Sequence, residues 1–194
     1  MNPADPRVGP NPGVSSSITT LATREVYRNH WMRVREDLVL RANGQQGVYG
    51  VVEKHDAAIM LAIEDGCIWL VEQFRYTIGA RALELPQGGW EEEIDNPEDL
   101  ARGELREEIG MDASRMQCLG QLWIAYGFLR QKQFVYLATG LTPAQATRDA
   151  EEHDLTARRV PIADFERMLL DGIIRDNCTL AAWGLYRMWK EQRG

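Results

Sequence analysis

The most informative part of the sequence is Leu85-Pro-Gln-Gly-Gly-Trp-Glu-Glu-Glu-Ile-Asp95, together with the nearby segment Gly103-Glu-Leu-Arg-Glu-Glu-Ile-Gly-Met111. If its second part is helical, Glu104, Glu107 and Glu108 stand at i, i+3 and i+4 and project from one face. Like charges at this spacing repel and cost helix stability, so the cluster needs an explanation. One explanation is a solvated acidic face. The other is a magnesium site, because Mg²⁺ binds through carboxylates, water and phosphate oxygens.

The residues around these glutamates predict a loop followed by a helix over 97–109. Asn96 is a favourable N-cap, Pro97 suits the first helical position, and Gly110 suits the C-terminal stop. Before the helix, Gly88-Gly89 predicts a tight turn in which a backbone carbonyl can approach a cation. The loop therefore favours the magnesium site over the solvated face.

Short β-rich runs predict strands over much of the remaining chain. They lie at residues 25–39, 47–52, 58–63, 68–71, 118–123 and 134–138, with turn signals at Asn43-Gly44 and Asp65-Gly66. Two more helices are predicted at about 164–170 and 179–192. The predicted class is therefore mixed α/β.

Composition narrows the functional classes. The chain has 194 residues, of which 44% are hydrophobic, which is enough for one core and one domain. Residues 1–19 are rich in Pro, Gly and Ser and predict a disordered tail before a domain at 20–194. The formal net charge of −7 argues against nucleic acid and anionic membrane as partners.

The remaining composition points to a cytoplasmic protein. No apolar run approaches the ~18 residues that a membrane span requires. The three cysteines are odd in number, have no zinc spacing and fit a reducing cytoplasm. Neither the cysteines nor the three histidines suggest a catalytic set, and the first residues lack the order of a signal peptide.

The loop and helix together resemble the Nudix box. That motif is a glycine, five residues, Glu, seven residues, and then Arg-Glu-aliphatic-any-Glu-Glu-any-Gly-aliphatic. Seven of its nine defined positions agree here, namely Gly89, Glu104, Leu105, Glu107, Glu108, Gly110 and Met111. Coincidence at this many positions is improbable.

Two positions depart from the box. Asp95 stands in place of its first Glu and keeps the charge, whereas Gly103 stands in place of the Arg that braces the metal-binding glutamates in the family. Arg102 points about 100° away from the direction of residue 103 around the helix axis, so it cannot simply replace the missing arginine. Arg106 lies about one turn after Gly103 and is the better substitute for the brace.

The resemblance implies a fold and a metal site. The fold is the Nudix α/β/α sandwich with a mixed sheet, preceded by an N-terminal antiparallel strand region. The implied cofactor is Mg²⁺, with Mn²⁺ as an alternative. Its implied ligands are Glu104, Glu108 and the Gly88 carbonyl, with Glu107 supporting the site or binding another ion.

The resemblance extends over most of the chain, from about Val26 to the last helix, and the chain is similar to one Nudix subfamily, the ADP-ribose and nucleoside-diphosphate-sugar pyrophosphatases. The similarity lies in Leu70-Val-Glu-Gln-Phe-Arg-Tyr76 and Glu84-Leu-Pro-Gln-Gly-Gly89. Arg75 matches an arginine that implies a diphosphate contact, although an ordinary surface arginine is as good an interpretation. The subfamily forms homodimers by crossing N-terminal strands, and Trp31 would stack on the base there. A core or interface tryptophan is the alternative for Trp31.

The subfamily also implies a catalytic carboxylate outside the box. The segment Glu151-Glu-His-Asp154 matches the loop that supplies it, with Glu152 as the first candidate and Asp154 as the second. Glu151 is the third candidate in the loop, and Glu107 or Glu108 is reconsidered if the loop does not supply the base. A merely solvated loop is the alternative. The segment Tyr126-Gly-Phe-Leu-Arg-Gln131 departs from the Pro-Gly-Phe motif and acidic residue of ADP-ribose hydrolases, which leaves other nucleoside diphosphate sugars open.

The function implied by this resemblance is metal-dependent hydrolysis of a diphosphate bond in a small nucleotide substrate. The substrate would be a nucleoside diphosphate sugar or ADP-ribose, and the products a nucleoside monophosphate and a sugar phosphate. Two alternatives stay open. One is a Nudix hydrolase of dinucleoside polyphosphates, nucleoside triphosphates or capped RNA, and the other is a non-catalytic Nudix-like nucleotide-binding module.

Overall fold

The computed structural model describes residues 17–89, 96–144 and 154–193. It divides the chain into two compact units, Met1–Glu53 and Lys54–Gly194. This boundary falls inside the single domain that the sequence predicts at 20–194. The tail predicted at 1–19 lies outside the described residues, except at its end, where the first strand begins at Ile18.

The first unit contains three antiparallel strands, as expected from the resemblance. They are β1 (Ile18–Arg28), β2 (Arg33–Arg41) and β3 (Gln46–Glu53). The β2–β3 turn contains Gly44 with a φ of 79°, a conformation that glycine adopts readily. Strand β1 starts at Ile18, before the predicted residue 25. The prediction missed its first half because all of its side chains are exposed, so no alternation of buried and exposed residues marks it.

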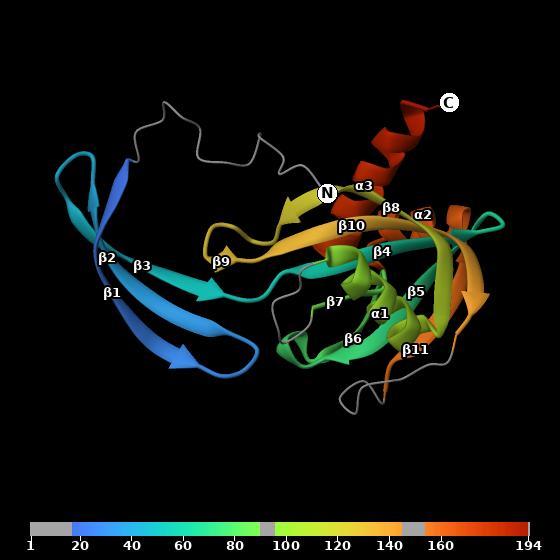
Figure 1. Cartoon of the computed structure of the whole chain (residues 1–194), viewed down its shortest axis with the longest axis horizontal. Coiled ribbons are helices and arrows are strands. Elements are labelled where there is room, and N and C mark those ends of the chain that lie inside the picture. The colour runs from blue at the N-terminus through green and yellow to red at the C-terminus, as the bar shows by residue number, and fades with distance from the viewer. Residues whose placement is uncertain (1–16, 90–95, 145–153, 194) are drawn as a thin grey trace. The chain divides into compact units, whose positions relative to one another are not determined.

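A mixed sheet forms the centre of the second unit, in the order β11-β5-β4-β10-β8 (Figure 1). Strands β4 and β10 run parallel, while β10–β8, β4–β5 and β11–β5 are antiparallel. The strands span Ala57–Glu64 (β4), Cys67–Arg75 (β5), Met111–Trp123 (β8), Lys132–Pro143 (β10) and Thr156–Pro161 (β11). Short elements lie at Tyr76–Ile78 (η1) and Leu129–Arg130 (β9).

Alternate residues of β4 divide this sheet between two cores. Ala58, Met60 and Ala62 pack with the buried residues of helix α1 (Pro97–Ile109). Ile59 and Leu61 point to the other face and pack with α2 (Ile162–Leu170) and α3 (Asn177–Glu191). Successive side chains of a strand point to opposite faces, so helices cover both sides. The predicted α/β/α sandwich with a mixed sheet is confirmed.

Strands β4 and β5 separate shortly after their hairpin, and this gap receives the glycine loop. The two strands pair at Ile63–Ile68 and Glu64–Cys67. Further along, β6 (Ala80–Glu84) pairs with β5 and β7 (Gln87–Gly88) pairs with β4. The chain therefore crosses between the separated strands at Leu85-Pro86 and delivers Gly88 to the side of β4.

Among the described residues, no helix is long and apolar enough to span a bilayer.

The predicted helix 97–109 agrees with α1 at both ends, whereas α2 and α3 each begin two residues before the predicted start. Strand β11 was not predicted, because Thr156–Pro161 alternates weakly and has a single buried residue, Val160.

Candidate active site

Helix α1 presents the acidic residues of the site. Its start is fixed by the Asn96 side chain, which accepts a hydrogen bond from the Glu98 N–H, and its end by Gly110 in a left-handed conformation. Between these caps, Glu104 and Glu108 are buried, with 4% and 1% of their surface exposed. Two carboxylates this deeply buried, one turn apart, do not fit a solvated acidic face.

Strand β7 meets these carboxylates directly. The Gln87 N–H donates a 2.8 Å hydrogen bond to Glu108 Oε2. A Cβ placed on Gly88 would lie 2.3 Å from Glu104 Oε2 and 2.5 Å from its Oε1, so the carboxylate occupies the space of a side chain at this position. The structure thus brings Gly88, Glu104 and Glu108 together, as the sequence predicts.

This arrangement fits a divalent cation. Buried carboxylates beside a strand backbone offer hard oxygen donors, which are the ligands that Mg²⁺ prefers. Glu107 is half-buried on the same helix. Among the described residues, no group of three or more Asp, Glu, His or Cys side chains is close enough together to hold a metal by itself. A cation here would need backbone or substrate oxygens as well, which is the usual condition for Mg²⁺.

Arg75, at the end of β5, is paired with a buried glutamate. Its Nε and Nη2 atoms lie 2.8 and 2.6 Å from Glu84 Oε1. The Arg75 side chain is 39% exposed, whereas the Glu84 side chain is 4% exposed. Burial raises the pKa of Glu84, and Arg75 opposes that rise while the nearby Asp176 adds to it. Arg75 is therefore held by its counter-ion with part of the guanidinium open to solvent.

Asp154 is anchored to the β5–β6 hairpin. Its Oδ2 atom accepts hydrogen bonds from the Phe74 N–H at 3.1 Å and from Arg81 Nη1 at 3.0 Å. Its carbonyl accepts a further hydrogen bond from Arg81 Nη2. Glu152, the first candidate for the general base, lies outside the described residues. Asp154 lies two residues before strand β11 begins.

Three other residues from the sequence analysis have defined surroundings. Trp31, in the first unit, is exposed, and the centroid of its ring lies 3.8 Å from the centroid of the His30 ring. Arg106, the suggested replacement for the missing box arginine, donates to Asp112 at 3.4 Å. Gly103 is buried within α1.

Sequence reasoning missed a polar network behind β7. It contains Glu84, Gln87, Gln133, Asp176 and Thr179. Its members come from β6, β7, β10 and α3, and partners such as Gln87 and Asp176 are 89 residues apart. The one sequence signal was the position of Glu84 and Gln87 inside the quoted stretch that ends at Gly89.

Two family models match this chain, and their border lies one residue from the border between the two structural units. The model described as "NUDIX domain" matches residues 53–181. The model described as "Nucleoside diphosphate sugar hydrolase N-terminal domain" matches residues 18–52. Together they cover nearly all of the described residues.

Individual relatives agree with the family models. The chain is 35% identical over 164 residues to an ADP-ribose pyrophosphatase of Mycobacterium tuberculosis, covering 84% of this chain and 79% of the relative. It is 27% identical over 136 residues to an ADP-ribose pyrophosphatase of Bacillus subtilis, covering 70% and 73%. A crystal structure of an ADP compounds hydrolase has the same fold, with a TM-score of 0.79 at 24% identity over 92% of this chain and 96% of that one.

Proposed function

Because the chain belongs to the Nudix hydrolase family, we propose that it hydrolyses the diphosphate bond of ADP-ribose or of a nucleoside diphosphate sugar. Water attacks one phosphorus, the bridging P–O bond breaks, and the products are a nucleoside monophosphate and a sugar phosphate. The observation that carries this proposal is the contact of Gly88 with the buried Glu104 carboxylate, in a chain whose relatives are ADP-ribose pyrophosphatases.

The family is typically dependent on a divalent metal. We assign the metal site to Glu104, Glu108 and the Gly88 carbonyl, with Glu107 supporting it, and we propose Mg²⁺ as the ion with Mn²⁺ as a substitute. The ion would neutralise phosphate charge and help to ionise the attacking water. The site would otherwise repel its substrate, because both the glutamates and the diphosphate are anionic.

The remaining roles belong to residues outside the metal site. Arg75 would contact a diphosphate oxygen with the open part of its guanidinium. The general base would come from Glu152 or Asp154, because carboxylates committed to a cation are poor proton acceptors. Glu151 is the third candidate, and Glu107 or Glu108 would be the base only if this loop does not supply it. Trp31 would stack on the base, and Trp31→Ala should then raise KM more than it lowers kcat.

A substrate panel tests this function. Wild type and Glu108→Gln are incubated with Mg²⁺ or Mn²⁺ and each substrate, and the nucleotide products are separated from the intact substrate by anion-exchange chromatography. The panel contains ADP-ribose, ADP-, UDP- and GDP-sugars, dinucleoside polyphosphates, nucleoside triphosphates and capped RNA. Turnover confined to the last three classes would replace the proposed substrate class. Binding without turnover of any compound would favour a nucleotide-binding module.

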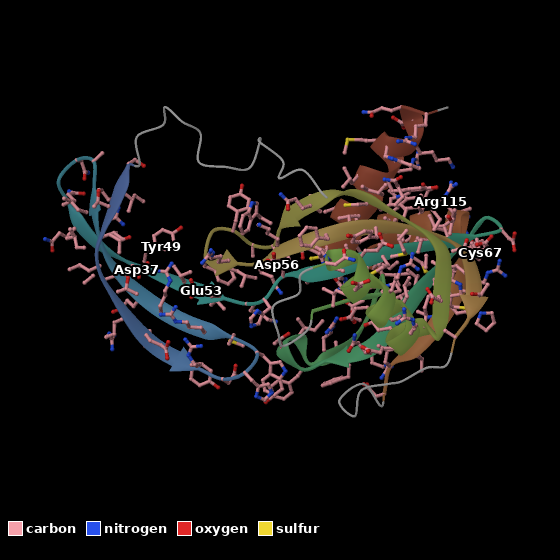
Figure 2. The ribbon with its side chains drawn as sticks, in the orientation of Figure 1. Asp37, Tyr49, Glu53, Asp56, Cys67 and Arg115 are labelled. Carbon is pink, nitrogen blue, oxygen red and sulfur yellow. The ribbon has the colours of Figure 1, made fainter. Side chains whose placement is uncertain are left out.

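We also propose a homodimer formed through the first unit. Every residue of β1 is exposed, and apolar side chains on the three strands face solvent, including Tyr27 at 54% and Val48 at 59%. Figure 2 labels Asp37, Tyr49 and Glu53 on β2 and β3 of the same unit. Exposed strands of this kind are aggregation hazards unless they are covered, and a second copy related by a two-fold axis would cover them.

Light scattering at micromolar concentration tests the assembly. Wild type should have twice the mass of the chain, and Tyr27→Glu combined with Val48→Lys should shift it toward the monomer. A matched pair of charge substitutions at exposed positions of α3, Leu180→Glu and Met188→Lys, should leave the mass unchanged. A monomeric wild type would remove both the dimer and the assignment of base stacking to Trp31.

We place the protein in the cytoplasm because Cys67, Cys118 and Cys178 are free thiols.

A further inference from the structure

Gln87 occupies the centre of the buried polar network behind the metal site. Its side-chain Nε2 donates to Glu84 Oε2 at 2.9 Å and to Asp176 Oδ2 at 3.0 Å. Its Oε1 accepts from Gln133 Nε2 at 2.8 Å. Both amide protons and the amide oxygen are therefore engaged. The orientation of the amide is fixed, because carboxylates only accept hydrogen bonds.

The backbone of the same residue reaches the other side of strand β7. Its N–H donates to Glu108 Oε2 at 2.8 Å, and the next residue, Gly88, lies against the Glu104 carboxylate. A side chain that locks Gln87 in place therefore also fixes the backbone atoms that face both buried glutamates of α1.

The network also extends to Arg75 through Glu84. One oxygen of Glu84 accepts from Arg75, and the other accepts from Gln87. On the α3 side, Asp176 caps the helix by accepting from the N–H and the hydroxyl of Thr179, both at 2.7 Å. Gln87 thus connects the arginine assigned to the diphosphate, the N-terminus of α3 and the strand beside Glu108.

We propose that Gln87 is a positioning residue that sets the geometry of the divalent-metal site by anchoring β7 to Glu84 and Asp176. It does not touch the metal or the substrate with its side chain. The inference rests on the proposed metal site at Glu104 and Glu108. Glutamine suits this role because it supplies two donors to two neighbouring carboxylates without adding charge. Burial raises the pKa of Glu84 because it disfavours the charged carboxylate, and the hydrogen bond from Gln87 opposes that rise. Loss of this donor would therefore destabilise the buried carboxylate.

The test uses Mn²⁺ binding, followed by the electron paramagnetic resonance signal of free Mn²⁺, on the full chain without substrate. Gln87→Met keeps the length of the side chain and removes all three hydrogen bonds. We expect its Kd for Mn²⁺ to rise about 10–100-fold, the usual effect of removing a residue that orients a metal ligand. The matched control is Gln117→Met on β8, which loses a hydrogen bond to the Cys118 carbonyl away from the network. Its Kd should equal that of wild type.

Two more variants separate positioning from a general loss of packing. Gln73→Met removes a 3.2 Å donor to Glu84 without altering β7, so it should leave the Mn²⁺ Kd within about twofold of wild type. Gln133→Met removes only the donor to Gln87 Oε1, so it should weaken Mn²⁺ binding less than Gln87→Met does but more than Gln73→Met does.

The outcomes distinguish this inference from the proposed function. If Gln87→Met is folded by circular dichroism and binds Mn²⁺ as wild type does, the inference is wrong. Should Gln87→Met not fold, the comparison of Gln133→Met with Gln73→Met decides instead, and equal Mn²⁺ affinities in these two variants overturn the inference. If wild type hydrolyses no substrate in the panel but Gln87→Met still weakens Mn²⁺ binding, the inference stands and the proposed function fails.

Discussion

Gly88→Ala is expected to disable the metal site without unfolding the protein. The added Cβ would lie 2.3 Å from Glu104 Oε2, whereas ordinary contact begins at 3.4 Å. The carboxylate must therefore retreat by about 1 Å, and a misplacement of that size can cost about 100-fold in turnover. Gly88 is not among the glycines with positive φ, so alanine fits its backbone without strain. Only the end of a flexible side chain has to move.

The assay compares Mn²⁺ affinity, kcat and thermal unfolding of wild type, Gly88→Ala and Gly184→Ala. We expect Gly88→Ala to bind Mn²⁺ about 10–100-fold more weakly and to keep its unfolding midpoint within a few degrees. Gly184 lies within α3 with nothing within 4 Å of an added Cβ, so its alanine variant should gain up to about 1 kcal/mol of stability with unchanged Mn²⁺ affinity.

A double substitution sharpens the same prediction. Glu104→Asp shortens the side chain and withdraws the carboxylate from the space that the added methyl group of Gly88→Ala would need. The two changes should therefore couple, with the double variant losing less Mn²⁺ affinity than the two single losses added together. Additive losses, or a Gly88→Ala variant that binds Mn²⁺ like wild type, would show that Glu104 does not need its place beside Gly88.

Further predictions concern the glutamates and α1. Glu108→Gln should lower kcat at least 100-fold with the fold intact, because it removes one charged ligand; unchanged turnover in steady-state kinetics would contradict the metal assignment. Gly103→Arg should keep or raise Mn²⁺ affinity and gain up to about 1 kcal/mol of helix propensity, and a large loss of affinity would mean that the buried site is packed around the glycine. Glu152→Gln should lower kcat much more than it raises KM, and full kcat in both this variant and Asp154→Asn would place the base elsewhere. Glu84 binds its proton more tightly in the folded chain than in the unfolded one, so the stability of Glu84→Gln relative to wild type should increase as the pH rises above about 4.3, as measured by urea unfolding.

The sequence predicted the parts of the site that depend on neighbouring residues. Helix α1 has its N-cap, its glycine stop and its three glutamates within one short segment, so each local preference supports the same structure. The approach of Gly88 to Glu104 was also predictable, because the loop and the helix belong to one continuous motif. The limits of β1 were less predictable, since an exposed strand has no buried alternation to mark its start.

The residues that hold β7 were not predictable in the same way. Gln87 bonds to Gln133, 46 residues away, and to Asp176, 89 residues away. Polar residues of this kind give no periodic signal, and they meet only because β4 and β5 separate and admit the chain at Leu85-Pro86. Their pairing is a property of the folded sheet and not of any local segment.

These contacts explain how α1 can tolerate its acidic cluster. Glutamates at i, i+3 and i+4 repel one another, and burial adds a desolvation cost. Strand β7 offsets part of this cost by donating the Gln87 N–H to Glu108, and a cation would offset more of it by neutralising the charge. The helix carries the glutamates, and by our proposal the geometry of the metal site is set by the two-residue strand β7, which Glu84 and Asp176 hold through Gln87. Substitutions that remove a hydrogen bond from the Gln87 side chain should therefore alter Mn²⁺ affinity, although this side chain lies behind β7.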